Sequence, residues 1–292
     1  MPVLFGLAAA LAYGAADFVG GFVSRRMSVI AVVLWSQLVG IALLGAMLPF
    51  FAGAPSAPAL GWGAAAGIAG ALGVLLLYRG LARGRMSVVA PITAVEAAAV
   101  PVVAGMLTGE RPGAVASLGV GLALVAVALI SSAGGNPALD RASTPDPEPG
   151  ETSVAGRAPG VPEAFGAGLA FGAFFILVDR SGSATGLWPL IGTKLSSIAL
   201  VGLLALGARP SLRAARPVRV PVAAAGVLDA LANVFYLLAV RRGLLSLVAV
   251  LTSMYPAGTV LLARVVLAER IAPRQAIGFV LAGAAVVFIA LG

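Results

Sequence analysis

Charged and turn-forming residues cut this sequence into ten long apolar segments, and no other feature limits the fold as strongly. The segments cover residues 3–22, 29–51, 59–78, 86–108, 112–131, 163–178, 187–207, 220–240, 244–267 and 271–291. A bilayer core is about 30 Å thick, and a helix needs about 20 mostly apolar residues to cross it. Lipid offers no partner for unpaired backbone groups, and the alternating pattern of a membrane barrel is absent. The pattern therefore predicts an all-α membrane protein with ten transmembrane helices.

The composition supports lipid as the solvent and excludes several kinds of chemistry. Apolar residues make up 60% of the chain and charged residues 10%, against about 45–50% and about 25% in soluble domains. The chain has no Cys and no His, which removes disulfides, thiolate or imidazole metal sites, and cysteine or histidine catalysis. We therefore expect no metal, no cofactor and no enzyme activity. The net charge of +8 comes from residues between the apolar segments, so we expect the lipid bilayer and a small solute as partners, and no nucleic acid.

A stretch rich in proline and glycine, residues 132–162, divides the chain into two halves. It cannot bury enough apolar area to fold, so we predict a disordered linker between residues 1–131 and 163–292. Segment 163–178 is short, and we expect it to gain a turn from its flanks or to bend.

The two halves also repeat in sequence. A shift of 159 positions aligns uncommon residues such as Arg83 with Arg242 and Glu110 with Glu269. Each half has five segments, and an odd number places the second copy upside down. We predict two inverted five-helix repeats around a central cavity, an architecture that secondary transporters use.

Away from the ends of the apolar segments lie four ionisable residues, Asp17, Glu96, Lys194 and Asp229, and each costs about 2.5–3.5 kcal/mol on insertion scales. Because of this cost, we expect them to face a cavity or a partner. The residues predicted to bind substrate or couple an ion are Asp17, Gln37, Glu96, Lys194, Asp229 and Asn233. The predicted cavity lining adds Tyr13, Trp35, Thr93, Tyr236, Thr252 and Tyr255, and helix kinks are predicted at Pro91, Pro101 and Pro256.

Two of the ionisable residues have a purely structural alternative. The carboxylate of Asp17 can reach the interface to pair with Arg25 or Arg26. Lys194 can form a buried ion pair with one of the three carboxylates that only fixes helix packing. Both alternatives stay open at this point.

Other conspicuous residues predict structural roles. Glu110 and Glu269 precede the fifth and tenth segments, so we expect each to favour the positive end of the helix that follows. Gly63, Gly67 and Gly70 are spaced for close helix packing.

Several short stretches, taken together with their doubling and order, resemble the EamA-type members of the drug/metabolite transporter superfamily. They are Ala16–Gly21 with Ser24–Arg26, Gly84–Pro91, Gly109–Arg111, Thr252–Pro256 and Ala268–Arg270. The resemblance covers the whole chain except the linker. It implies ten helices around a central cavity and export or exchange of small organic solutes by alternating access. Family members commonly have Glu-Pro in the fourth span, where this chain has Glu96 followed by Ala97.

The orientation in the membrane has two conflicting indications. Loops on the side of the termini carry four arginines, and loops on the other side carry eleven without counting the linker. The positive-inside rule therefore predicts termini outside the cytoplasm. The resemblance implies cytoplasmic termini, so the orientation stays open.

These observations predict a multi-pass secondary transporter of a bacterial inner or plasma membrane, with a small metabolite or drug-like molecule as its solute. No nucleotide-binding motif is present, so a gradient must drive transport. A proton taken up by Glu96 or Asp229 is the expected coupled ion, because burial favours a neutral carboxyl group; facilitated passage is the alternative. The acidic and aromatic lining suits amines or amino acids, but Lys194 could equally meet a carboxylate.

Two other functions remain as alternatives. A lipid or lipid-carrier flippase would have a cavity that opens sideways between helices and large apolar walls. A membrane-embedded enzyme is disfavoured, because the carboxylates are single and spread over three segments.

Overall fold

The computed structural model describes residues 1–24, 26–83, 86–132, 160–182, 184–212, 216–266 and 271–292, and within them all regular structure is helical. The helices are α1 (Pro2–Ser24), α2 (Val29–Met47) with the 3₁₀ turn η1 (Leu48–Phe50), α3 (Ala57–Arg83), α4 (Met86–Leu107), α5 (Ala114–Ser132), α7 (Val161–Asp179), α8 (Trp188–Ala208), α9 (Arg216–Val240), α10 (Leu245–Thr252), α11 (Tyr255–Val266) and α12 (Pro273–Leu291). The prediction of an all-α chain is confirmed. Most of the predicted linker lies outside the described residues.

The lengths of the helices agree with the predicted segments. Over the described residues, nine stretches are long and apolar enough to cross a membrane, with α10 and α11 counted as one, and α4 adds a shorter apolar helix over Pro91–Leu107. The short sixth segment gains residues at both ends, since α7 runs from Val161 to Asp179. Apolar runs of this length have no better solution in lipid than helices that satisfy their own backbone groups.

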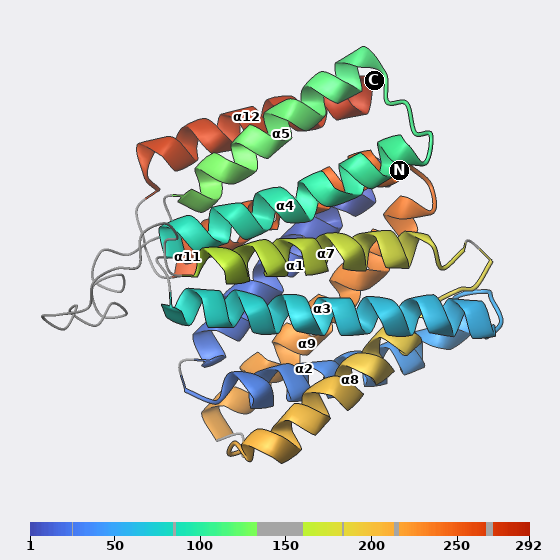
Figure 1. The fold of residues 1–292 in the computed structure, drawn as a ribbon, viewed down its shortest axis with the longest axis vertical. Coiled ribbons are helices and arrows are strands. Elements are labelled where there is room, and N and C mark those ends of the chain that lie inside the picture. Colours follow the sequence, from blue (N-terminus) through green and yellow to red (C-terminus); the bar gives the residue numbers. More distant parts are fainter. Residues whose placement is uncertain (25, 84–85, 133–159, 183, 213–215, 267–270) are drawn as a thin grey trace, which may run out of the picture.

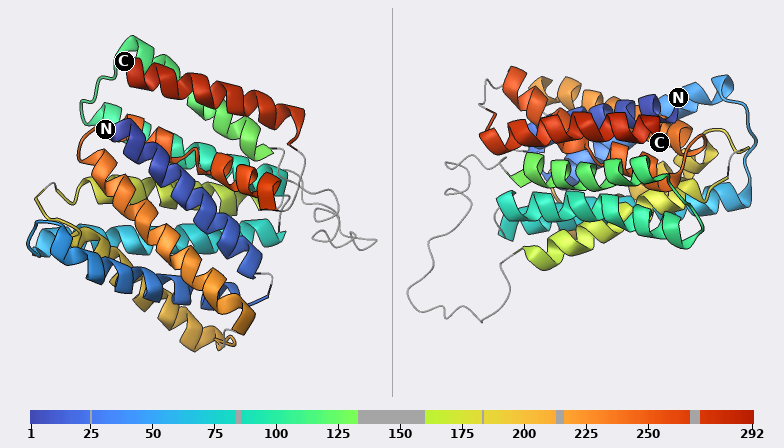
Figure 2. Two further views of the ribbon diagram at one scale, coloured as in Figure 1. Left: turned by 180° about the vertical axis from the view of Figure 1, so that it is seen from behind. Right: turned by 90° about the horizontal axis from the view of Figure 1, so that it is seen from above.

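The helices form two layers that are closed along both edges (Figures 1 and 2). One layer holds α3, α7 and α4, and the other holds α9, α1 and the α10–α11 pair. Helices α2 and α8 close one edge, and α5 packs on α12 along the other. The first helix of each half, α1 or α7, thus packs between helices of the other half.

Both chain termini lie at the same end of the bundle, which we call the termini end (Figure 1). The opposite end, where α5 ends and α7 begins, is called the linker end. Helices α1–α5 are the first half and α7–α12 the second half.

Glycines in α3 bring the two halves into close contact. A Cβ atom on Gly63 would lie 2.0 Å from the carbonyl oxygen of Pro189, and one on Gly67 would lie 2.1 Å from that of Thr193. A side chain at either position would therefore force α3 away from α8. Gly226 of α9 meets α2 in the same way, 2.5 Å from the carbonyl oxygen of Ser36. Small residues at such crossings let backbones approach and gain packing energy in lipid.

The predicted proline kinks take two different forms. Helix α4 continues through both Pro91 and Pro101. The ninth span is instead interrupted, because α10 ends at Thr252 and α11 starts at Tyr255, next to Pro256. Proline is favoured at the start of a helix, where its missing N–H group costs nothing.

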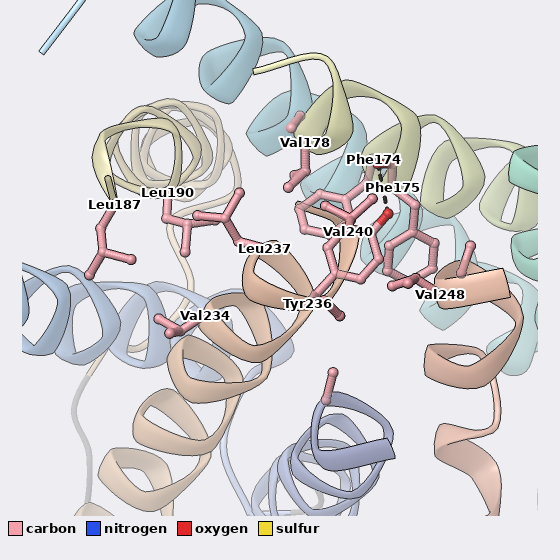
Figure 3. Close-up of a cluster of buried hydrophobic side chains, with 14 of the residues drawn as sticks. Phe174, Phe175, Val178, Leu187, Leu190, Val234, Tyr236, Leu237, Val240 and Val248 are labelled. Atoms are coloured by element: carbon pink, nitrogen blue, oxygen red, sulfur yellow. Dashed lines mark hydrogen bonds between the residues drawn. The ribbon is translucent and has the colours of Figure 1, made fainter. Parts of the chain in front are cut away.

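A large apolar cluster fills the bundle toward the termini end (Figure 3). It includes Phe174, Phe175 and Val178 of α7, with Tyr236 and Val240 of α9. The rings of Phe175 and Tyr236 lie 4.7 Å apart between their centroids. A smaller cluster of Val23, Val32, Val218 and Val222 joins α1, α2 and α9 nearer the linker end.

Candidate functional site

A cavity of about 140 Å³ lies between the two layers and receives side chains from both halves of the chain. Its polar lining consists of Tyr13, Asp17, Gln37, Thr193, Lys194, Ser197, Asp229, Asn233 and Tyr255. Its apolar lining consists of Val33, Gly67, Gly70, Ala71, Val74, Leu77, Ala97, Phe171, Phe174 and Phe175. Three of these side chains, Asp17, Lys194 and Asp229, are ionisable and lie at the depth of membrane-length helices.

An ion pair between Lys194 and Asp229 joins α8 to α9 at the cavity wall. The ammonium of Lys194 donates a hydrogen bond to Oδ2 of Asp229. Lys194 is 1% exposed, whereas the side chain of Asp229 keeps 27% of its exposure. Gly40 of α2 leaves room for the lysine, since a Cβ atom there would lie 3.1 Å from its Cε atom. Of the three carboxylates that the sequence offered to Lys194, the structure pairs it with Asp229.

A chain of hydrogen bonds extends from this pair to α1. Nδ2 of Asn233 donates to the carbonyl oxygen of Asp229, at 2.6 Å, and to its Oδ1, at 3.4 Å. The hydroxyl of Tyr13 donates to Oδ1 of Asn233, at 3.0 Å. Asp229 and Asn233 are one turn apart on α9, so helical spacing presents both to the same neighbours.

Asp17 and Gln37 also line the cavity but have free acceptor atoms. Asp17 is exposed as a residue, and no described residue forms a hydrogen bond or an ion pair with its carboxylate. The predicted alternative partner Arg26 stacks on Phe22, with its guanidinium carbon 4.9 Å from the ring centroid, and Arg25 lies outside the described residues. Oε1 of Gln37 is buried without a hydrogen-bond partner.

Glu96 of α4 packs against α7 and does not line the cavity. A Cβ atom on Gly168 of α7 would lie 2.6 Å from its Cβ atom and 3.0 Å from its Oε2. That oxygen is buried and has no hydrogen-bond partner. The neighbouring Ala97 lines the cavity in its place.

Four aromatic or hydroxyl residues from the predicted lining also lie elsewhere. Trp35 is 41% exposed and donates its indole N–H to the carbonyl oxygen of Leu212. Thr93 is buried against α7, where its hydroxyl donates to the carbonyl oxygen of Ala164. Thr252 is fully buried at the end of α10.

Tyr236 is the fourth of these residues. It is 0% exposed and lies in the apolar cluster, and its hydroxyl donates to the carbonyl oxygen of Phe175, at 2.9 Å (Figure 3). The helical spacing that places Tyr236 on the same face as Asp229 thus leads out of the cavity and into the apolar cluster.

The sequence reasoning missed an aromatic wall that α7 contributes. Phe171, Phe174 and Phe175 all line the cavity. A signal for Phe171 existed, because the repeat aligns it with Tyr13, which was predicted as lining. The same shift aligns Phe175 with Asp17, whereas Phe174 carried no such signal, and aromatic residues in an apolar segment are usually packing residues.

At the termini end, Glu110 ties the two halves together. Its Oε1 accepts a hydrogen bond from the backbone N–H of Leu245, at 2.6 Å, and its Oε2 accepts from that of Ser246, at 2.9 Å. Unpaired N–H groups at a helix start need such acceptors. The carboxylate thus caps α10, and the expectation that it serves the helix after it, α5, is wrong. Glu269 lies outside the described residues.

Loop contacts and a half-buried arginine add to the closure of the termini end. The indole N–H of Trp188 donates to the carbonyl oxygen of Gly53, at 3.4 Å, which joins the start of α8 to the α2–α3 loop. Arg241, just beyond α9, donates to the hydroxyl of Thr185, at 2.8 Å. Burial and, second, the neighbouring charge of Arg242 lower the pKa of Arg241 from its ordinary value.

The comparisons with known proteins agree with this architecture. No curated protein matches the chain, whereas eighteen chains of solved structures do. One of them, described only as "Crystal structure of protein", is 17% identical with a TM-score of 0.76, and the match covers 99% of this chain and 96% of that chain. At this identity the likeness shows the fold alone.

A family model identifies the chain more specifically. The model of the EamA-like transporter family matches residues 1–132 and 158–291, which is nearly the whole sequence. This confirms the resemblance found in the sequence. The chain therefore belongs to the EamA-like transporter family of the drug/metabolite transporter superfamily and is a multi-pass membrane protein.

Proposed function

We propose that the protein is a secondary transporter of the cell membrane that exports or exchanges a small organic solute by alternating access. The observation that carries the proposal is the cavity between the two layers, which holds Asp17, Lys194 and Asp229 at the depth of membrane-length helices. Ionisable groups are expensive there, and they are typical of substrate or ion pathways. The solute would bind in this cavity between the halves.

Pairs of lining residues support an inverted duplication as the basis of this mechanism. Tyr13 and Phe171 are 158 positions apart, as are Asp17 and Phe175. Gln37 and Lys194 are 157 positions apart, and these separations agree with the shift that relates the two halves. Contacts between helices follow the same relation, since α1 packs on α9 as α7 packs on α3. Inverted repeats of this kind offer two equivalent arrangements, one open to each side of the membrane.

The two ends of the bundle differ in a way that fits one of those arrangements. The apolar cluster, the Glu110 cap and the contact between Trp188 and Gly53 lie at the termini end. Toward the linker end, the cavity lining continues along α3 as far as Leu77, and Asp17 stays exposed. We infer a state that is open at the linker end and closed at the termini end. Transport would require the opposite state as well.

A transport assay with a matched pair of variants tests the proposal. Purified protein is reconstituted in liposomes, and counterflow is measured with radiolabelled 2-phenylethylamine, phenylalanine and uridine as separate probes. Ala71 lines the cavity and is 4% exposed, whereas the next residue, Leu72, is 43% exposed on the outside of α3. Ala71→Trp should abolish uptake of any transported probe, and Leu72→Trp should leave it unchanged. Equal uptake in both variants would contradict transport through this cavity.

Proton coupling is part of the same proposal. Glu96 has a buried carboxylate oxygen without a partner, and Asp229 faces Lys194, Asn233 and the cavity. Either carboxylate could take up a proton in one state and release it in the other. Transport would then depend on an imposed pH gradient, and Glu96→Gln or Asp229→Asn should remove that dependence. An unchanged dependence in both variants would exclude these residues as the proton carriers.

A further inference from the structure

We propose that the solute is a small organic amine. It binds in the cavity as a cation that donates N–H hydrogen bonds, and it carries no carboxylate. This inference rests on the proposed function and assigns the substrate class to the same cavity. It follows from which hydrogen-bonding atoms of the cavity are occupied and which remain free.

Several donors of the cavity are engaged by the protein itself. The ammonium of Lys194 donates to Asp229, and Nδ2 of Asn233 donates twice to the same residue. The hydroxyl of Thr193 donates to the carbonyl oxygens of Gly63 and Pro189, at 3.0 Å each. The hydroxyl of Tyr13 is likewise engaged, with Asn233. The donors that stay free belong to uncharged groups, the hydroxyls of Ser197 and Tyr255 and the amide of Gln37.

The acceptors, in contrast, include free ones. The two carboxylate oxygens of Asp17 have no partner among the described residues, and Oε1 of Gln37 is buried without one. The hydroxyls of Ser197 and Tyr255 and the amide of Gln37 can each donate or accept, so they favour neither kind of ligand. The free group that distinguishes between ligands is therefore the carboxylate of Asp17, which calls for a ligand that donates hydrogen bonds and carries positive charge.

The charges of the cavity lead to the same ligand. The positive charge of Lys194 is balanced by Asp229, which leaves Asp17 as the unbalanced charge of the lining. A ligand with one positive charge would neutralise it in a medium where unpaired charges are costly.

Aromatic rings complete the recognition of a cation. Rings of Tyr13, Phe171, Phe174, Phe175 and Tyr255 all line the cavity. Aromatic faces attract ammonium groups, and the attraction is stronger where water is excluded. The same rings can hold the apolar body of an amine by area burial. The volume of about 140 Å³ limits that body to a small one.

A carboxylate on the ligand would be disfavoured. Its partner would have to be Lys194, which is 1% exposed and already paired. Displacing Asp229 from the ammonium would leave a second carboxylate unbalanced beside Asp17. Amino acids are therefore the class that the ion pair excludes.

Three probes that share one aromatic body separate these possibilities. They are 2-phenylethylamine, its neutral N-acetyl derivative, and phenylalanine, which adds a carboxylate. In the reconstituted protein we expect saturable counterflow of radiolabelled 2-phenylethylamine. We expect the N-acetyl derivative and phenylalanine to compete at least about 10-fold more weakly, because a charge-assisted hydrogen bond contributes about 1.5–3 kcal/mol.

Asp17→Asn and Asp179→Asn form the matched pair of variants. Asp17 has no partner to lose, so its replacement by the isosteric Asn should leave the thermal unfolding temperature unchanged. We expect it to weaken 2-phenylethylamine binding by about 10-fold or more. Asp179 is the last residue of α7 at the termini end and lies outside the cavity lining. Its replacement by Asn removes the same charge as Asp17→Asn. Its variant should transport like the unchanged protein.

The outcomes distinguish the substrate class from the proposed function. Transport of phenylalanine or uridine that Ala71→Trp abolishes, without transport of the amine, would overturn the amine and keep the transporter. Amine transport that is equally fast in Asp17→Asn would also overturn the inference. If radiolabelled 2-phenylethylamine, phenylalanine and uridine all fail to move, and thiol labelling of the cavity shows access from one side under all conditions, the proposed function fails. The substrate assignment then fails with it.

Discussion

The ammonium of Lys194 in α8 donates a hydrogen bond to Oδ2 of Asp229 in α9, and both residues lie inside membrane-length helices. Asn233, one turn further along α9, holds the same carboxylate and accepts in turn from Tyr13 of α1. Three helices are therefore joined by one polar chain inside an apolar bundle. Within this series of hydrogen bonds, the positive charge of Lys194 is paired with Asp229. The negative charge of Asp17 therefore stays available to a ligand.

Asp229→Asn tests the energetic role of this ion pair. Removing one partner of a buried pair leaves the other charge uncompensated, so we expect a loss of about 3–5 kcal/mol in stability. The unfolding temperature in detergent, followed by circular dichroism, measures the loss. The double variant Lys194→Met with Asp229→Leu should regain most of the stability, because the uncompensated charge is gone. A single variant as stable as the unchanged protein would contradict a buried pair.

Gly67→Ala tests the close crossing of α3 and α8. Its new methyl group would lie 2.1 Å from the carbonyl oxygen of Thr193, so the helices must separate at a cost of about 1–3 kcal/mol. Gly61→Ala on the same helix is the control, since a Cβ atom there meets nothing within 4 Å. Alanine at that position should be neutral or stabilise by up to about 1 kcal/mol. Equal effects of the two substitutions on the unfolding temperature would speak against the crossing.

Glu110→Gln tests the cap that joins α10 to the α4–α5 loop. The amide can accept with only one oxygen, and its NH₂ group would face a backbone N–H of Leu245 or Ser246. We expect a loss of about 1–2 kcal/mol, as for the removal of other helix caps. Because the cap lies at the termini end, the variant should also increase thiol labelling of a cysteine placed at Val240. Unaltered stability and labelling would assign no closing role to Glu110.

The orientation can be decided with two exposed loop positions. Ser211 lies between α8 and α9 at the linker end, and Ala54 lies between α2 and α3 at the termini end. The eleven arginines of the linker-end loops predict that this end faces the cytoplasm. A membrane-impermeant maleimide applied to intact cells should therefore label Ala54→Cys and spare Ser211→Cys. The reverse result would support the cytoplasmic termini that the resemblance implies.

The helices could be predicted well from the sequence because their length is set by the bilayer. The break in the ninth span was harder to predict from the sequence. Pro256 predicted a kink, but the interruption after Thr252 depends on how α10 and α11 pack on α4 and α1. The partner of Lys194 was beyond sequence reasoning for the same reason, since three carboxylates were compatible with it and only the packing selects Asp229.

The cavity lining was predicted less completely than the helices. Polar residues inside a span, such as Asp17 and Asn233, were found because their cost in lipid is high. Tyr236 was placed in the cavity by helical spacing alone, and its position nearer the end of α9 brings it into the apolar cluster. Phe174 was missed, because an apolar side chain in a membrane helix looks the same whether it faces lipid, protein or a cavity.

Thiol accessibility on both sides of the membrane tests the alternating cavity most directly. The chain has no native cysteine, so Val74→Cys in the cavity and Val240→Cys in the apolar cluster each carry a single label site. Without solute, an impermeant maleimide should reach Val74→Cys from the linker side and leave Val240→Cys unlabelled. A transported solute should raise labelling of Val240→Cys from the termini side and lower that of Val74→Cys. Labelling of both positions at once, or no response of either to any transported solute, would contradict a cavity that opens to one side at a time.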